Sequence, residues 1–266
     1  MKSLARLPQI DALAVDERKF VTALARGLDV LRCFGAEDGL LGNREIADRT
    51  GLPKATISRL VYTLTELGYL RYDVDVGKYA LDAGVLALGY AFLGGADILT
   101  LARPHMRALA REMQSAVSLG CREGLEMVYL ETIRSEAALT LGLTAGSRLS
   151  MLTSSMGRTC LAVMSPGERS ATLAALRKAH PENWEQMSAG VERAVETFQR
   201  EGCCYSFREW HEGVNAVAVP VRDTRQQRWL AISCSGPASS IPEDKFRLEI
   251  GPRLKAMAAR LSGGHR

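Results

Sequence analysis

The chain has 266 residues, of which 47% are hydrophobic, and a formal net charge of +4. This length and composition predict two globular domains with ample cores. No run approaches the about 18 apolar residues of a membrane-spanning helix, and residues 1–19 mix charged and apolar side chains, which excludes a secretory signal. We therefore expect a cytoplasmic protein with no membrane partner.

An amphipathic helix over residues 23–34 is the first predicted element. Leu24, Leu28, Leu31 and Phe34 recur at helical spacing, and we expect them on its core side. The preceding residues 1–19 are expected to form a mixed tail.

Residues 41–64 predict two helices folded about a glycine. Ile46 and Ala47 mark the inner face of the first helix, which breaks at Gly51. Pro53 then starts a second helix, where its missing N–H does no harm. The buried stripe of this second helix is predicted to contain Ile57, Leu60, Val61, Leu64 and Leu67.

The opposite face of the second helix is polar and lightly basic. Donors and acceptors of this kind can meet base edges or phosphates, so the pair predicts a helix-turn-helix with a recognition helix. The outer face consists of Lys54, Thr56, Ser58, Arg59, Tyr62 and Thr63.

A β-hairpin wing is predicted next, with strands over residues 67–72 and 77–81. Asp73 and Asp75 in its turn would be repelled by phosphate, so the wing tip either stands off the DNA backbone or lies beside Lys78. Residues 1–80 hold about as many acids as bases, so DNA affinity must come from locally placed cations. The candidate DNA-binding residues are Arg26, Lys54, Thr56, Ser58, Arg59, Tyr62 and Lys78.

Residues 82–93 predict an apolar linker helix. Leu86, Tyr90 and Leu93 lie on one of its stripes, and Val85, Leu88 and Phe92 lie on another. A connector exposed to water should be polar, so an apolar one predicts self-association.

The remaining chain predicts an α+β domain with an antiparallel sheet, because its strands are separated by short gaps and interrupted by helices. The predicted helices span residues 98–113, 155–164, 166–176, 189–201 and 243–261, and the predicted strands span residues 116–121, 127–133, 138–143, 205–208, 214–222 and 229–235.

Across residues 20–262 the chain resembles the IclR-type transcriptional regulators. The motifs that carry the resemblance are LARGL at 24–28, GLPKAT at 51–56, GKYAL at 77–81, TSSMGR at 153–158, GVNAVAVPV at 213–221 and ISCSGP at 232–237. Segments 20–28 and 155–158 are most similar to the branch that controls aromatic-acid catabolism.

The resemblance implies a tail at 1–19, a winged helix-turn-helix domain at 20–81, a linker helix at 82–96 and a GAF-like effector-binding domain at 97–266. It implies a non-enzymatic regulator of a catabolic operon, without cofactor, whose partners are double-stranded operator DNA and a small organic-acid effector. Homodimers or dimers of dimers are expected through the linker region, and RNA polymerase is a further candidate partner.

An effector pocket is predicted at the start of the helix over 155–164, where unpaired N–H groups and the helix dipole favour an anion. The alternative role of this serine-rich segment is an N-cap. Ser233 and Ser235 alternate on a strand, so both hydroxyls face the same side. With the resemblance, the candidate effector-binding residues are Ser155, Met156, Gly157, Ser206, Ala216, Ser233 and Ser235.

Family members that bind very small organic acids often have an acidic residue where this chain has Ser206, and a polar residue or Cys where it has Ala216. The pocket is less polar, which favours a larger, aromatic acid. Arg158 is expected either to clamp a carboxylate or to brace a dimer. Trp210 is expected to be a packed aromatic, with a pocket lid as the alternative.

The sequence leaves two alternative functions, a hydrolase and a redox sensor. A hydrolase built from Ser155 and His211 lacks any G-x-S-x-G elbow. A redox sensor would use Cys160 or Cys234, yet the six cysteines show no C-x-x-C pair and no histidine at metal spacing, which predicts buried free thiols and no metal site.

Overall fold

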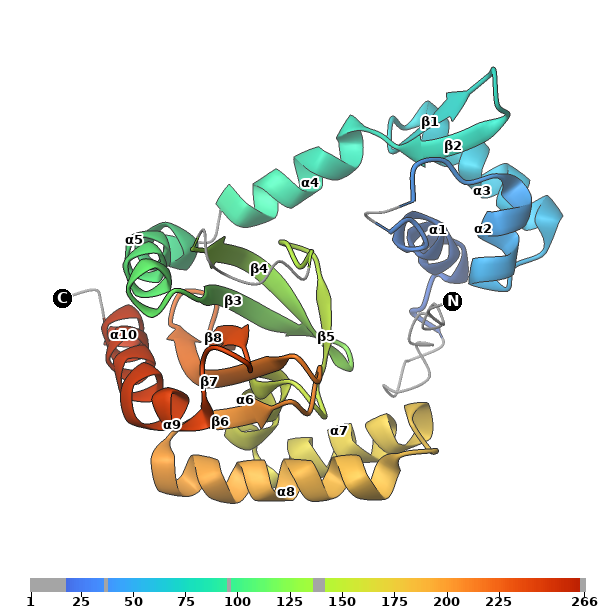
Figure 1. The fold of residues 1–266 in the computed structure, drawn as a ribbon. Coiled ribbons are helices and arrows are strands. Elements are labelled where there is room, and N and C mark those ends of the chain that lie inside the picture. Colours follow the sequence, from blue (N-terminus) through green and yellow to red (C-terminus); the bar gives the residue numbers. More distant parts are fainter. Residues whose placement is uncertain (1–17, 36–37, 95–96, 136–141, 264–266) are drawn as a thin grey trace. The chain divides into compact units, whose positions relative to one another are not determined.

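The computed structural model describes residues 18–35, 38–94, 97–135 and 142–263. Contacts divide the chain into two compact units, residues 1–95 and 96–266, and each is described by itself (Figure 1). The finer division into tail, DNA-binding domain, linker helix and effector-binding domain stays a prediction.

The N-terminal unit contains a helix-turn-helix followed by a two-stranded wing. Gly51 ends the first helix of the motif in the left-handed conformation, with φ 70°, which glycine adopts without strain. Pro53 is the cap before the second helix rather than its first residue. The elements are α1 (Thr22–Arg32), α2 (Asn43–Thr50), α3 (Lys54–Glu66), β1 (Leu70–Asp73), β2 (Lys78–Leu81) and α4 (Ala83–Gly94).

The prediction of which residues of α1 face the core is partly wrong. Val30 and Cys33 are buried against α2 and α3, and Leu31 and Phe34 pack at the edge of this core. Leu24 and Leu28 remain 63% and 45% exposed. The helix carries two apolar stripes, and the one that contains Val30 faces the core.

The recognition helix α3 buries the expected stripe except at its end. Ile57, Val61 and Leu64 are buried and Leu60 packs against the same cluster. Leu67 was predicted to be buried but is exposed, because the helix ends at Glu66 and Leu67 is its C-cap.

In the wing, β1 and β2 pair antiparallel from Leu70 opposite Leu81 to Asp73 opposite Lys78. The side chain of Asp73 accepts the N–H groups of Asp75 at 3.1 Å and Val76 at 3.3 Å. This carboxylate therefore organises the turn.

Helix α4 contains no charged residue. Leu86, Leu88 and Tyr90 are exposed in the single chain, by 61%, 56% and 67%. The helix thus leaves an apolar surface open to water.

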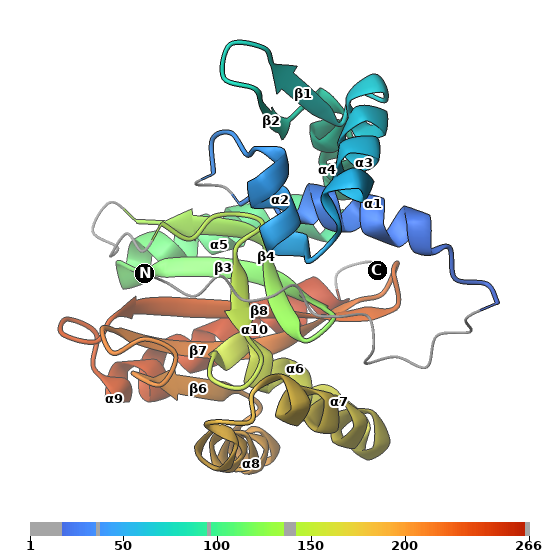
Figure 2. The ribbon, with the colours of Figure 1, turned by 90° about the vertical axis from the view of Figure 1, so that its right-hand side faces the viewer.

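The C-terminal unit contains a six-stranded antiparallel sheet in the order β5-β4-β3-β8-β7-β6, of which Figure 2 shows β3, β8, β7 and β6 in succession. Its strands are β3 (Ala116–Glu123), β4 (Glu126–Arg134), β5 (Arg148–Ser150), β6 (Cys204–Phe207), β7 (Val214–Asp223) and β8 (Arg228–Pro237). Its helices are α5 (Asp97–Met113), α6 (Ser155–Val163), α7 (Pro166–Ala179), α8 (Trp184–Glu201), α9 (Glu243–Lys245), the π-helical turn η2 (Phe246–Ile250) and α10 (Gly251–Gly263).

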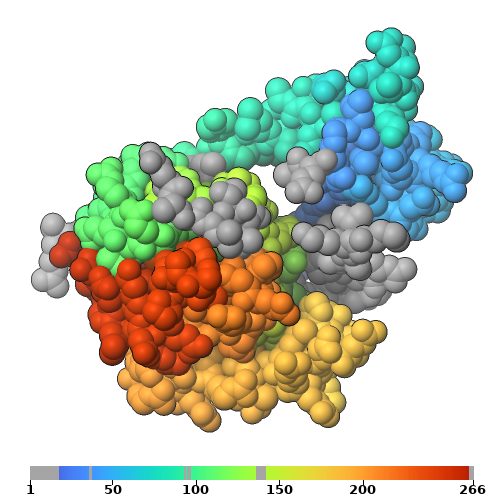
Figure 3. Space-filling view, viewed as in Figure 1, coloured from blue at the N-terminus to red at the C-terminus, as the bar shows by residue number. Residues whose placement is uncertain are grey.

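Side chains on the two faces of the sheet differ in size. Large residues such as Val117, Leu119 and Ile232 alternate with small ones along β3 and β8. Helices α5 and α10 pack against the sheet and against each other, and Figure 3 shows their surfaces side by side. On the opposite face, a Cβ at Gly120 would lie 3.1 Å from the sulfur of Met156 in α6. On β3 and β8 the positions that face α6 carry small residues, such as Ser118, Gly120 and Ser233, which leaves room for a cavity there.

Most predicted elements of this unit are present, with four differences. The predicted strand 138–143 falls mainly on residues outside the described part, and Gly142 and Leu143 are not in a strand. The short strand β5 was not predicted. Helix α8 begins five residues earlier than expected, and the C-terminal helix is interrupted by η2.

The predicted α+β fold is confirmed, with a helix-turn-helix unit followed by an antiparallel-sheet unit. Among the described residues, no single helix is long and apolar enough to cross a membrane. Helices α4 and α5 reach the length and composition of a membrane-spanning segment only when they are counted as a bent pair.

Candidate functional site

The outer face of α3 presents polar side chains to solvent. Lys54, Arg59 and Tyr62 are exposed, and Thr56 is half-buried. Ser58 is exposed, but its hydroxyl donates to the carbonyl of Lys54 at 3.1 Å and accepts from Asn43 at 3.3 Å. Arg26 is exposed on α1, apart from this helix in sequence.

The predicted DNA contact Lys78 already has a partner. Its ammonium lies 3.0 Å from the carboxylate of Glu45, which also accepts the N–H of Gly42 at 2.7 Å at the start of α2. These two contacts, the Gly42 N–H first, hold the pKa of Glu45 below its usual range. Lys78 thus joins the wing to α2.

A cavity opens between the sheet and the start of α6. It contains about 410 Å³ of space outside protein atoms, including its opening to solvent. Six of the seven predicted effector-binding residues line it; Gly157 does not. Its lining consists of Tyr129, Leu143, Leu149, Ser154, Ser155, Met156, Ser206, Trp210, Val214, Ala216, Ser233 and Ser235.

Ser154 caps the first turn of α6. Its hydroxyl accepts the N–H of Gly157 at 3.0 Å and donates to the carbonyl of Ser150 at 2.6 Å. The N–H groups of Ser155 and Met156 lie at helix positions without an intrahelical acceptor. The helix start therefore combines both expected roles, an N-cap and a wall of the cavity.

Gly157 was predicted to contact the effector, but the structure gives it a packing role. A Cβ there would lie 2.2 Å from the Cα of Met151 and 2.6 Å from the carbonyl oxygen of Ser150. The backbone of α6 passes so close to the segment after β5 that only glycine fits.

A group of hydroxyls lies on the sheet side of the cavity. Ser233 pairs with Ser118 across β8 and β3, and the Ser118 hydroxyl lies 3.1 Å from that of Thr132. Burial raises the pKa of Tyr129. Hydrogen bonds with Ser118 and Ser233 lower this pKa and offset part of the increase. Tyr129 escaped prediction because the register of β4 against β3 brings it here, and no local pattern reveals that register.

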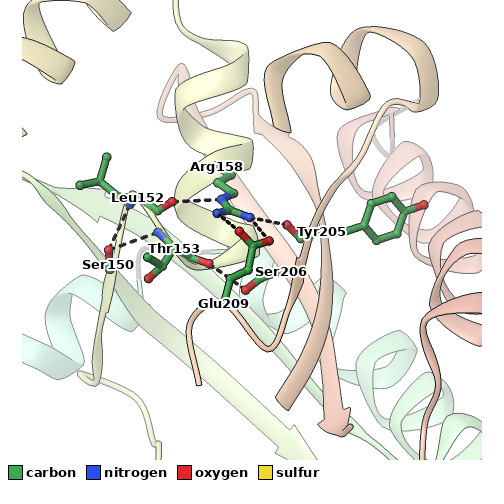
Figure 4. Close-up of polar contacts among 7 residues, drawn as sticks. All are labelled: Ser150, Leu152, Thr153, Arg158, Tyr205, Ser206 and Glu209. Atoms are coloured by element: carbon green, nitrogen blue, oxygen red, sulfur yellow. Dashed lines mark hydrogen bonds and ion pairs between the residues drawn. The ribbon is translucent and has the colours of Figure 1, made fainter. Parts of the chain in front are cut away.

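Arg158, which was expected to clamp a carboxylate or to brace a dimer, is buried and already paired with groups of its own unit. Its side chain is 4% exposed, and both terminal nitrogens donate to the Glu209 carboxylate at 2.6 Å (Figure 4). It also donates to the carbonyls of Leu152 at 3.0 Å and Tyr205 at 3.2 Å. The charge is therefore matched within the unit.

The six cysteines are free, and five are buried, with Cys121 half-buried. Burial raises the pKa of Cys160 to about 11 and that of Cys234 to about 12. Because the thiolate is the reactive form, these environments disfavour the redox-sensor alternative.

The hydrolase alternative needs a hydrogen bond between Ser155 and His211, and none joins these two residues in the described part of the chain. The Nδ1 atom of His211 accepts the N–H of Gly213 at 3.1 Å in an exposed loop, whereas Ser155 is buried at the cavity wall. Within the described ranges, no cluster of three or more His, Cys, Asp or Glu side chains could hold a metal ion.

Known proteins match both units. The family profile described as "Bacterial transcriptional regulator IclR C-terminal" matches residues 90–263, and the profile described as "IclR helix-turn-helix domain" matches residues 23–74. The HTH-type transcriptional regulator TsaQ1/TsaQ2 of Comamonas testosteroni is 34% identical over 93% of this chain and 89% of that protein.

Solved structures match over nearly the whole chain. An IclR family transcriptional regulator from Brucella abortus is 45% identical with a TM-score of 0.88, covering 96% of both chains. An IclR homolog from Microbacterium hydrocarbonoxydans, complexed with 4-hydroxybenzoate, has a TM-score of 0.71 at 23% identity, covering 91% of this chain and 98% of that chain. The latter likeness concerns the fold.

Proposed function

The chain belongs to the IclR family of bacterial transcriptional regulators, and from this premise we propose that it controls a catabolic operon in response to a small aromatic acid. It is a DNA-binding regulator and not an enzyme. The observation that carries the proposal is the lining of the cavity at the start of α6, because it places serine hydroxyls beside apolar and aromatic side chains, as a small organic acid requires. Its expected place of action is the cytoplasm, where the chromosome lies, and RNA polymerase stays a candidate partner.

Helix α3 is the element that we assign to the major groove. Lys54, Arg59 and Tyr62 project from its solvent face, as base and phosphate contacts require. Thr56, Ser58 and Arg26 are supporting contacts in this proposal. Lys78 shares its charge with Glu45, so we expect it to add less affinity than Arg59 does.

Arg59→Ala should weaken operator binding by about 1–3 kcal/mol if the guanidinium reads a guanine. Lys54→Ala should weaken binding to all sequences alike, because a lysine bound to phosphate carries no sequence information. Fluorescence anisotropy with operator and scrambled duplexes at one salt concentration measures both effects. Equal operator affinity of the Arg59→Ala variant and the wild type would place a different face of α3 in the groove.

The effector in this proposal is an acid with an aromatic ring. The N–H groups at the start of α6 and the hydroxyls of Ser155, Ser233 and Ser235 supply donors for a carboxylate. Met156 and Ala216 supply apolar walls for a ring. The 4-hydroxybenzoate complex of the Microbacterium homolog is support from a protein of the same fold.

Removing both hydroxyls with Ser233→Ala and Ser235→Ala tests this pocket. Each lost bond to a charged group is worth about 1.5–3 kcal/mol, so we expect a drop of at least roughly tenfold in affinity for 4-hydroxybenzoate. Titration calorimetry, with melting curves and with the exposed Ser240→Ala variant as control, measures it. Wild-type affinity in the double variant would remove the pocket assignment.

The exposed apolar surface of α4 is the surface that we assign to a homodimer. Leu86, Leu88 and Tyr90 are open to water in the single chain, and a second copy would cover them. A dimer also matches operators built from two half-sites.

A further inference from the structure

The loop between β6 and β7, residues 208–213, brings an aromatic side chain to the cavity wall. Trp210 lines the cavity and is only partly buried, so its side chain borders the ligand space and is also partly exposed to solvent. It also packs against the hydrophobic cluster that contains Met156 and Tyr129. The position of this loop therefore decides how completely the cavity is closed.

A single ion pair ties this loop to α6. The guanidinium of Arg158 binds the carboxylate of Glu209 through two parallel hydrogen bonds of 2.6 Å, an arrangement that fixes orientation as well as distance (Figure 4). Glu209 immediately precedes Trp210 in the chain. Holding the carboxylate thus limits where the indole can lie.

Arg158 is itself held rigidly. Its remaining hydrogen bonds go to the carbonyls of Leu152 and Tyr205, and a Cβ at Gly190 of α8 would lie 2.6 Å from its Nη2 atom. The adjacent backbone is tied by the Ser206 hydroxyl, which donates to the carbonyl of Thr153 at 2.7 Å. Arg158 therefore acts as a fixed anchor.

The loop needs such an anchor. Arg208 enters it with φ 59°, a left-handed conformation that is strained for a residue with a Cβ and persists only when surrounding contacts impose it. If Glu209 lost its charge, a buried guanidinium would lose its ionic partner as well. Both effects favour displacement of the loop.

We propose that Arg158 and Glu209 are positioning residues that hold Trp210 against the bound effector and thereby set how slowly an aromatic acid leaves the pocket. The inference rests on the proposed function for the ligand class. Trp210 contacts the ligand's ring in this account, while Arg158 and Glu209 are absent from the described lining and act through it. Arg158 lies just after the first turn of α6. The same helix therefore presents its first N–H groups to the ligand and, through Arg158, anchors the loop 208–213.

Glu209→Gln is the main test, made in a Trp184→Phe, Trp229→Phe background that leaves Trp210 as the reporter. Stopped-flow fluorescence with 4-hydroxybenzoate should show dissociation accelerated about tenfold, corresponding to about 1.4 kcal/mol, with association changed less than about twofold. Without ligand, acrylamide should quench Trp210 more strongly than in the parent. Glu212→Gln in the same loop is the matched control and should behave as the parent does.

Glu209→Asp keeps the charge while shortening the side chain, so it should fold even if Glu209→Gln does not, and its dissociation rate should be intermediate. Parental dissociation and quenching in both Glu209 variants would overturn the inference. If the parent does not bind 4-hydroxybenzoate, the ligand class proposed above fails instead. Acrylamide quenching of Trp210 without ligand then still tests the ion pair. Stronger quenching in Glu209→Gln than in Glu212→Gln would show that the ion pair holds Trp210, and equal quenching would show that it does not.

Discussion

Gly157→Ala is expected to lower the free energy of unfolding of the C-terminal unit by about 3 kcal/mol or more. The added Cβ would meet the Cα of Met151 at 2.2 Å and the carbonyl oxygen of Ser150 at 2.6 Å. These are backbone atoms, so no side-chain rotation relieves the overlap. Urea unfolding followed by circular dichroism measures the change.

Gly167→Ala is the matched control, because it also lies in the first turn of a helix but has no heavy atom within 4 Å of the added Cβ. That substitution should be neutral or stabilising by a few tenths of a kcal/mol up to about 1 kcal/mol. A Gly157→Ala protein as stable as the wild type would contradict the close contact between α6 and Met151. In that case Gly157 would again be a candidate contact for the effector.

Leu86→Glu is expected to dissociate the proposed dimer and, as a consequence, to reduce operator binding by at least about a hundredfold. A twofold interface contains each substitution twice, and burying two unpaired carboxylates costs several kcal/mol. Sedimentation velocity over a range of protein concentrations measures the assembly, and anisotropy measures the binding to DNA.

Leu248→Glu is the control for added charge, since Leu248 is 80% exposed in the other unit and the proposal assigns it no contact. Its dimer and its operator affinity should match the wild type. If the Leu86→Glu protein sediments as the wild type does, the interface lies elsewhere.

Helical periodicity was enough to predict the helix-turn-helix, but not which face of α1 turns inward. Leu24 and Leu28 form a stripe as apolar as the one that contains Val30 and Cys33, and only the latter meets α2 and α3. The choice depends on tertiary packing, which overrides a local pattern.

Tertiary contacts also explain where the site predictions fell short. The pairing of Lys78 with Glu45 and that of Arg158 with Glu209 join residues 33 and 51 positions apart, so no local motif reveals them. Ser155, Ser206 and Ser233 could be placed at one cavity because strand alternation and the family resemblance agree. Tyr129 was missed because strand register was unknown.

In the proposed function, an aromatic acid in the pocket of the C-terminal unit changes the affinity of the helix-turn-helix unit for DNA. The most direct test of this change is anisotropy with duplex from the region upstream of the chain's own gene, titrated with and without saturating 4-hydroxybenzoate. We expect operator affinity to change at least about fivefold, the lower end of typical allosteric coupling, and the Ser233→Ala, Ser235→Ala protein to lose this response. If calorimetry shows that the wild type binds the acid while its operator affinity stays unchanged, the acid does not regulate DNA binding and the proposed function is wrong.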